Sequence, residues 1–180
     1  MLTDEKLMND VCRGELSEMS QLWNRYHVRI YNYFRKTGQD KSTSEDLTQT
    51  VFERALKYRK SYKDSYPFKS WIYRIASNVK VDHFKKSSRS EYAGLENVHA
   101  ASTDTADQNI TQGEKYNQLY QAMSSLSDEQ KKVIYLAKYE EMKYVDIAEI
   151  IGCSESALKV KVHRAMKTLK KAYLNENYAG

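Results

Sequence analysis

The sequence predicts an all-α protein made of two small helical domains joined by a flexible linker. Apolar residues recur at three- and four-residue steps along most of the chain, which is the spacing of one helix face. One proline and six glycines in 180 residues leave few of the tight turns that a sheet-rich fold needs. We expect residues 1–89 to form the first domain, 90–112 the linker, and 113–180 a second domain that contains a helix-turn-helix.

The first domain opens with a long amphipathic helix that reaches about Arg35 and ends at Gly38. Its buried face is predicted from the helical spacing of Leu16, Met19, Leu22, Trp23, Tyr26, Ile30 and Tyr33. A second helix is predicted from a capping box at residues 42–45 to about Tyr58, because a hydroxyl residue stands three positions before an acid. Leu47, Val51 and Ala55 form its apolar side, which leaves Asp46, Gln49 and Glu53 on the flanking faces.

Residues 68–86 read as one helix with two unlike faces, preceded by a loop over residues 61–67. The apolar stripe consists of Phe68, Ile72, Ile75, Ala76 and Val79. Another side combines an aromatic ring, an amide and cations, at Trp71, Arg74, Asn78 and Lys85. Bases stack on aromatic rings and cations hold phosphates, so this side suits nucleic acid. A core helix with a solvated basic face gives the same pattern, and this helix alone leaves both readings open.

The second domain follows a stretch rich in Ser, Thr, Ala, Asp and Asn that has no apolar period, which is typical of a linker. A helix is predicted over residues 115–124, and residues 127–130 form a capping box for the next. A short helix over residues 144–151 stops at Gly152, and Ser154 caps a last helix that reaches about Tyr173. We expect small residues at Ala148 and Gly152 to let these two helices approach closely.

The last helix also has two sides. Leu158, Val162, Ala165 and Leu169 form the stripe that faces its partners. The other side and its flanks carry Ser156, Lys159, Val160, Lys161, His163, Arg164 and Lys167. Such a helix can enter the major groove of DNA. A generic antiparallel helical hairpin is the alternative, and the charge pattern favours DNA binding.

Charge is distributed in blocks along the chain. The formal net charge is +5 and the isoelectric point is near 9.0. Ten Lys or Arg and two acids lie between Lys57 and Arg89, and six cations without an acid lie between Lys159 and Lys171. Four acids and no Lys or Arg lie between Glu91 and Gln112. Two basic blocks around an acidic spacer predict two surfaces that contact a polyanion.

The N-terminal segment, the apolar runs, and the cysteine and histidine positions argue against several classes of function. The N-terminus lacks the apolar core of a signal peptide, and no apolar run reaches membrane-spanning length, so we expect no membrane insertion and a cytoplasmic protein. The two cysteines, Cys12 and Cys153, read as isolated thiols in a reducing compartment. The four histidines are scattered, and neither a metal-ligand spacing nor a Gly-rich phosphate loop occurs. We therefore expect no enzyme activity, no metal and no cofactor.

Taken together, the motifs resemble those of the extracytoplasmic-function sigma factors of bacterial RNA polymerase. The matching segments, in order, are SEDLTQTVF (44–52), WIYRIASN (71–78) with Asp82 and Lys85, SLSDEQ (125–130), and DIAEIIG (146–152) with KVKVHRA (159–165). The resemblance covers about residues 10–175. It implies two helical domains, of which the first reads and opens the minus-ten promoter element and the second reads the minus-thirty-five element.

The resemblance also implies partners and roles for single residues. Asp46, Gln49 and Glu53 are expected to contact the clamp helices of core RNA polymerase. A pocket for a flipped base of the non-template strand is expected from Tyr62, Lys63, Tyr66 and Asn78, because such a base needs an aromatic wall and a partner for its edge. Lys80, Lys85 and Lys86 are expected to hold phosphates. Promoter DNA and an anti-sigma factor complete the expected partners.

The chain departs from the family pattern at three positions. Thr50 stands where the family often has an acid, which weakens one expected clamp contact. Ala157 and Val160 stand where Thr and Ser are frequent, so the last helix lacks hydroxyl donors there. Val160 can instead touch a thymine methyl group.

Two other classes of function compete with a sigma factor. A helix-turn-helix repressor or activator with a ligand-sensing N-terminal half needs an apolar pocket in residues 1–90, whereas that half places its cations and Trp71 on an exposed face. A tyrosine recombinase is suggested by the fifteen tyrosines, but no Arg and His constellation is available to activate a phenol. Tyrosines on helix surfaces and at interfaces are the simpler explanation.

Overall fold

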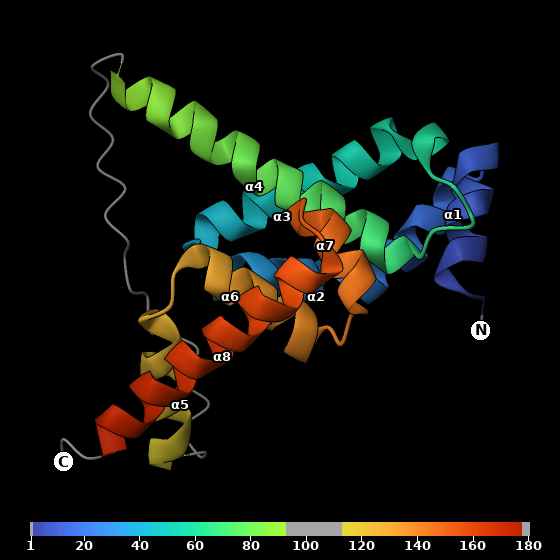
Figure 1. Ribbon diagram of the computed structural model, residues 1–180. Coiled ribbons are helices and arrows are strands. Elements are labelled where there is room, and N and C mark those ends of the chain that lie inside the picture. The colour runs from blue at the N-terminus through green and yellow to red at the C-terminus, as the bar shows by residue number, and fades with distance from the viewer. Residues whose placement is uncertain (1, 93–112, 178–180) are drawn as a thin grey trace. The chain divides into compact units, whose positions relative to one another are not determined.

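The computed structural model describes residues 2–92 and 113–177, and within these residues the regular elements are all helices, as predicted. They fall into two compact units, one built from α1 to α4 and the other from α5 to α8 (Figure 1). Most of the predicted linker, residues 93–112, lies outside the described part of the chain.

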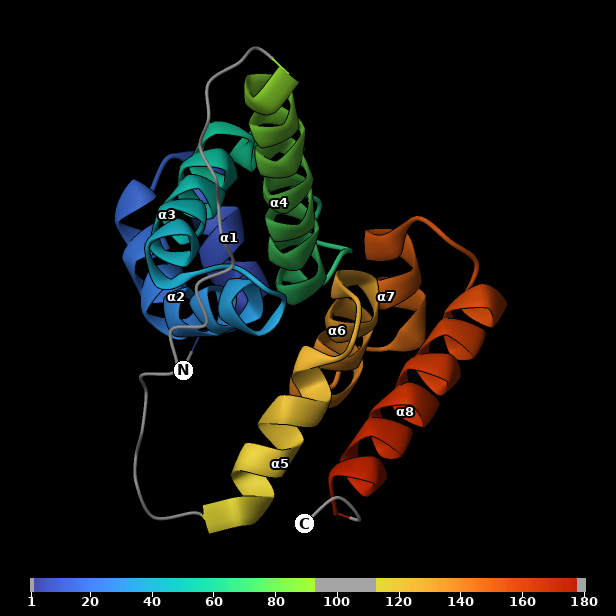
Figure 2. The same ribbon diagram turned by 90° about the vertical axis from the view of Figure 1, so that its left-hand side faces the viewer.

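The N-terminal unit contains four α-helices and two short 3-10 turns. These are α1 (Asp4–Arg13), η1 (Leu16–Glu18), α2 (Met19–Lys36), α3 (Lys41–Lys57), η2 (Arg59–Ser61) and α4 (Phe68–Tyr92). Figure 2 shows α3 and α4 side by side, and the two helices are in contact. Large apolar and aromatic side chains from all four helices form the core, including Leu7, Leu22, Ile30, Tyr33, Phe34, Val51, Phe68 and Ile72.

Two helix starts in this unit differ from the sequence prediction. No separate helix is predicted before Leu16, yet α1 forms there, capped by Thr3, whose side chain accepts a hydrogen bond from the N–H of Lys6. The predicted capping box at residues 42–45 is wrong as the start of α3. Asp40 caps that helix instead, and its carboxylate accepts hydrogen bonds from the N–H of Thr43 at 2.9 Å and from its hydroxyl at 2.6 Å. Each of the two carboxylate oxygens of Asp40 thus accepts one hydrogen bond from Thr43.

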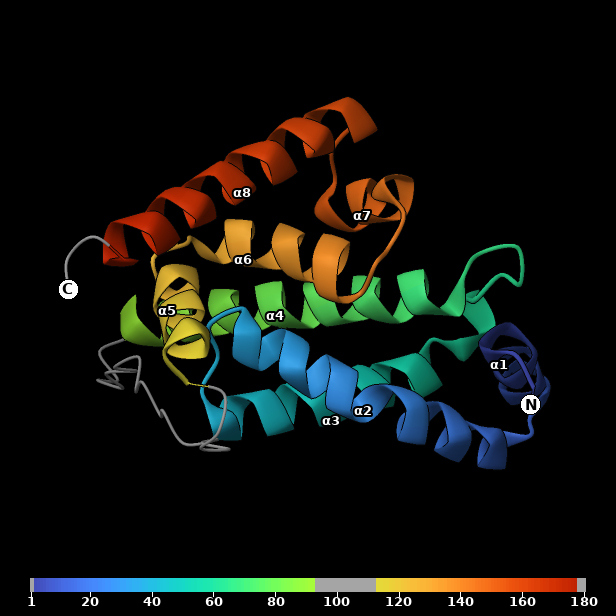
Figure 3. The same cartoon turned by 90° about the horizontal axis from the view of Figure 1, so that it is seen from below.

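The C-terminal unit contains α5 (Gly113–Ser124), α6 (Asp128–Ile134), a π-helical turn η3 (Tyr135–Tyr139), α7 (Tyr144–Ile151) and α8 (Glu155–Asn177). The long helix α8 contacts α5, α6 and α7, which cover its apolar side (Figure 3). The core comes from Ala122, Leu126, Val133, Leu136, Ile147, Leu158, Val162 and Ala165. The predicted capping box at residues 127–130 is confirmed, because both reciprocal hydrogen bonds of Ser127 and Gln130 are present.

Candidate nucleic-acid and polymerase interfaces

The two faces predicted for α4 are present in the structure. Phe68, Ile72, Ala76 and Val79 are buried, and Tyr73, which the stripe did not include, is buried with them. On the other side, Arg74, Asn78, Lys85 and Lys86 are exposed and Trp71 is half-buried. An aromatic edge, an amide and three cations are thus available to a ligand along one helix.

Lys80 departs from this arrangement. Its side chain is only 6% exposed, and its Nζ lies 5.6 Å from the centre of the Phe84 ring. Lys80 lies nine positions after Trp71, which is about two and a half turns of a helix with 3.6 residues per turn, so the two side chains leave opposite sides of α4. The helical period that predicts Trp71 on the outer side of α4 therefore also predicts that Lys80 points toward the core.

The loop before α4 is organised by aromatic rings. Tyr62 is 8% exposed, and its ring meets those of Trp71 and Phe68 edge-on at 5.3 and 6.3 Å. Its hydroxyl donates to the carbonyl of Tyr66 at 2.8 Å. Burial, with a smaller contribution from the charge of Glu5, raises the pKa of Tyr62 above its ordinary value, so the hydroxyl remains a donor at neutral pH. Tyr62 thus supports Trp71 from inside, whereas Lys63 is exposed and Tyr66 half-buried.

A polar face on α3 lies opposite its buried side. Asp46, Gln49 and Glu53 are all exposed and follow one another at helical spacing. Gln49 donates to the carboxylate of Glu53 at 3.0 Å. Thr50 is half-buried and its hydroxyl donates to the backbone carbonyl of Asp46 at 2.9 Å, so this hydroxyl already has a partner within the helix. The face presents carboxylate and amide groups to solvent.

The predicted helix-turn-helix is confirmed in α7 and α8. Gly152 ends α7 with φ 77°, and the N–H groups of Gly152 and Cys153 both bond to the carbonyl of Ala148. Ser154 then accepts a hydrogen bond from the N–H of Ala157 at 3.2 Å and opens α8. A β-carbon added at Gly152 meets nothing within 4 Å, so the expected close helix approach at this glycine is wrong. The left-handed backbone is the reason for a glycine here.

The two sides of α8 are likewise as predicted. Leu158, Val162 and Ala165 are buried, and Leu169 is half-buried. The exposed residues are Ser156, Lys159, Val160, His163, Arg164 and Lys167. Val160 is 48% exposed although it is apolar, so its methyl groups are available to a partner.

Two lysines of α8 already have acidic partners within this unit. Lys159 pairs with Glu155 one turn earlier at 2.8 Å, and Lys161 pairs with Glu129 of α6. In each case the hydrogen bond to the carboxylate raises the pKa of the lysine above its ordinary value. Both lysines therefore carry full positive charge at neutral pH and are available to phosphate once the acid is displaced.

Within residues 2–92 and 113–177, no group of His, Cys, Asp and Glu side chains is arranged to hold a metal ion. Over the same residues, no helix has both the length and the apolar character needed to cross a membrane.

Comparison with known proteins identifies the two units. Residues 22–90 match the model of sigma-70 region 2, and residues 116–169 match that of sigma-70 region 4. The RNA polymerase sigma factor YlaC of Bacillus subtilis is 27% identical over 156 residues, which cover 85% of this chain and 90% of that protein. The ECF RNA polymerase sigma factor SigW of the same organism is 26% identical over 177 residues, covering 93% and 95%.

Solved structures agree on the fold. CnrH, in complex with the cytosolic domain of CnrY, superposes with a TM-score of 0.67 at 22% identity and covers 93% of this chain and 95% of its own. The sigma factor RpoE of Bartonella quintana, in complex with the anti-sigma factor NepR, gives a TM-score of 0.67 at 21% identity, with coverage of 86% and 96%.

These matches define the chain as a sigma-70-type transcription initiation factor with regions 2 and 4. The chain belongs to the extracytoplasmic-function sigma factors of bacterial RNA polymerase. It therefore acts with core RNA polymerase to direct transcription from promoters, and it is not an enzyme.

Proposed function

We propose that the N-terminal unit binds the clamp of core RNA polymerase through Asp46, Gln49 and Glu53 of α3 and opens the minus-ten element with α4 and the loop before it. The observation that carries the proposal is the surface of α4, where Trp71, Arg74 and Asn78 share one side of a helix anchored in the core. An aromatic edge and an amide next to cations can hold an extruded base and its phosphates together. Lys63, Lys85 and Lys86 add exposed positive charge for the same strand.

The C-terminal unit reads the minus-thirty-five element by placing α8 in the major groove. The exposed residues Ser156, Val160, His163 and Arg164 face the bases, whereas Lys159 and Lys161 lie on the flanks, where they meet phosphates. The proposed domains are residues 1–89 and 113–180, with residues 90–112 between them, of which residues 90–92 continue α4. Such a factor works in the cytoplasm, where an anti-sigma protein is the expected antagonist.

Reconstituted transcription tests this proposal. Purified protein is mixed with bacterial core RNA polymerase and a library of promoter fragments, and run-off transcripts are sequenced to find their start sites. We expect starts at a defined subset of fragments that share two elements upstream. Core polymerase that starts no more specifically with the protein than without it contradicts the proposal. A variant with both Arg164→Ala and Asn78→Ala serves as a control, because it keeps the α3 face but changes both DNA-reading surfaces.

A further inference from the structure

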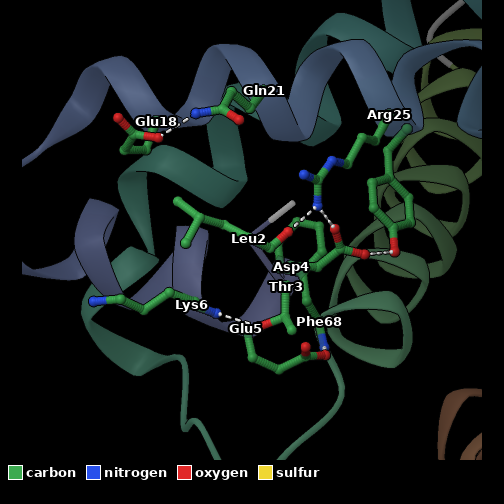
Figure 4. Close-up of polar contacts among 10 residues, drawn as sticks. Leu2, Thr3, Asp4, Glu5, Lys6, Glu18, Gln21, Arg25 and Phe68 are labelled. Carbon is green, nitrogen blue, oxygen red and sulfur yellow. Dashed lines mark hydrogen bonds and ion pairs between the residues drawn. The ribbon is translucent and has the colours of Figure 1, made fainter.

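The first turn of α4 receives a hydrogen bond from a distant part of the chain. The helix starts at Phe68, directly after Pro67, and Pro67 has neither an N–H nor a side-chain oxygen to cap it. The N–H groups in the first turn of a helix have no partner within the helix. The Oε1 atom of Glu5 accepts the N–H of Phe68 at 3.1 Å, across 63 positions in the sequence (Figure 4). Its negative charge also lies at the positive end of the α4 dipole.

Glu5 is held in place by the way α1 is fixed to the unit. Leu7, Met8 and Val11 of α1 are fully buried. Asp4, next to Glu5, pairs with Arg25 of α2 and accepts a hydrogen bond from the hydroxyl of Tyr26, and Arg25 also donates to the carbonyl of Leu2 (Figure 4). The carboxylate of Glu5 is thus presented to α4 by a helix that is held by its own buried side chains and by polar contacts with α2.

Phe68 links this cap to the aromatic cluster before α4. The Phe68 ring lies 6.0 Å from Trp71 and 6.3 Å from Tyr62, and it meets the ring of Tyr26 edge-on at 5.1 Å. Any shift of the first turn of α4 therefore moves the rings that flank the exposed side of Trp71. The α1 helix lies before residues 22–90, which match sigma-70 region 2.

We propose that Glu5 is a positioning residue for promoter opening: by capping Phe68 it fixes the first turn of α4, and with it Trp71 and Tyr62, in the geometry that receives the extruded base. This inference rests on the proposed function of the N-terminal unit. Glu5 itself touches neither base nor phosphate, and it acts through the backbone of α4.

Three variants separate this role from simple stabilisation. Glu5→Ala removes the acceptor, whereas Glu5→Gln keeps an oxygen that can accept the Phe68 N–H and loses only the charge. Tyr26→Phe is the matched control, because it removes one hydrogen bond to Asp4 while the ion pair of Asp4 with Arg25 and the ring contact with Phe68 remain. Amide hydrogen exchange of the full-length protein reports the cap directly. We expect faster exchange of the Phe68 amide in Glu5→Ala and near-normal exchange in Glu5→Gln and Tyr26→Phe.

Open-complex formation with core polymerase provides the functional measurement, by permanganate footprinting on a closed promoter and on one with a pre-opened bubble. We expect Glu5→Ala to reduce opening of the closed promoter by about threefold to tenfold, the equivalent of one hydrogen bond. Polymerase binding should not change, the bubble should restore most of the opening signal, and Glu5→Gln should recover most of the activity. Tyr26→Phe should open the promoter normally.

Three outcomes would overturn the inference. Equal losses on both templates together with weaker polymerase binding mean that Glu5 only stabilises the fold, and they overturn the inference. Asn78→Ala is assayed in parallel to test the pocket. Normal opening by Glu5→Ala with defective opening by Asn78→Ala overturns the role of Glu5 and leaves the pocket in place. Normal opening by both variants overturns the pocket and, with it, the inference.

Discussion

Lys161 of the recognition helix α8 is paired with Glu129 of α6, 32 positions earlier in the chain. Both side chains remain partly exposed, at 38% and 59%. The same amino group is expected to meet a DNA phosphate, so the carboxylate of Glu129 competes with DNA for Lys161. Exposed ion pairs contribute little to stability, which makes this pair easy to exchange.

Glu129→Gln should therefore strengthen DNA binding by the C-terminal unit by a few-fold, because it removes a competing anion beside the DNA surface. The gain should shrink as salt screens the charge. Fluorescence anisotropy with minus-thirty-five duplexes at two salt concentrations measures both effects. Glu141→Gln removes one exposed acid elsewhere in the same unit and serves as the control. Equal gains from the two variants would mean that only the net charge matters.

Arg164→Ala and Lys159→Ala should weaken DNA binding in different ways. Arg164 lies on the side of α8 that we propose faces the groove, so its loss should reduce discrimination against wrong bases by about 1–3 kcal/mol. Lys159 lies on the flank and should lower affinity for specific and random duplexes alike. Competition binding with both duplexes measures the difference. If Arg164→Ala weakens binding to the specific and the random duplex equally, Arg164 contacts a phosphate and not a base.

Gly152→Ala should destabilise the C-terminal unit by about 1–2 kcal/mol, the cost of a left-handed backbone for a residue with a β-carbon. Nothing lies within 4 Å of that β-carbon, so the cost should come from the backbone alone. Gly152→Asn should cost less. Both tryptophans, Trp23 and Trp71, lie in the N-terminal unit. The denaturation midpoint followed by tryptophan fluorescence should therefore stay at the wild-type value, whereas circular dichroism should show loss of helix at a lower denaturant concentration. A shift of the tryptophan signal by the same amount would contradict this assignment.

Asn78→Ala should reduce promoter opening more than initial promoter binding, because a base captured by Asn78 is available only after the duplex opens. A pre-opened bubble removes the unstacking cost, which is on the order of a few kcal/mol, and should restore most of the loss. On the bubble template, the variant should still discriminate less than the wild type between bases at the position that Asn78 contacts. Permanganate footprinting on both templates measures opening. Normal opening with unchanged base preference would leave α4 as a phosphate-binding or structural helix.

Asp46→Ala combined with Gln49→Ala should weaken binding to core polymerase without lowering the melting temperature, since both side chains are exposed on the side of α3 opposite its buried residues. A pull-down against core polymerase with a thermal melt of the same samples measures the two quantities. Lys6→Ala changes an exposed residue of α1 and is the control. Wild-type binding by the double variant would remove α3 from the clamp interface.

Features set by local spacing were predictable from the sequence. The helix-turn-helix, the capping box at Ser127 and the buried stripe of α8 each depend on residues within a few turns of one helix. The contact between Glu5 and Phe68 was not predictable, because it joins two helices 63 positions apart. The start of α3 was misplaced because Asp40 and Ser42 are both good caps, and the path of the chain decides between them.

The π-helical turn η3 was missed for a related reason. It depends on a hydrogen bond from the N–H of Glu140 to the carbonyl of Tyr135, five residues back, and composition carries no signal for that spacing. In the candidate site, the exposed cations and amide followed from the helical period, whereas the burial of Tyr62 depends on its packing against Phe68 and Trp71.

The burial of Lys80 sets how strongly the minus-ten interaction should depend on salt. Each phosphate neutralised on a single strand releases about 0.7 of a counterion. With Lys80 turned toward Phe84, Lys85 and Lys86 are the exposed members of the three lysines assigned to phosphates. Their contribution to the slope of log affinity against log salt is then about −1.4 instead of about −2.1. The rings and the amide on α4 carry a correspondingly larger share of the binding, and this share persists as the ionic strength rises.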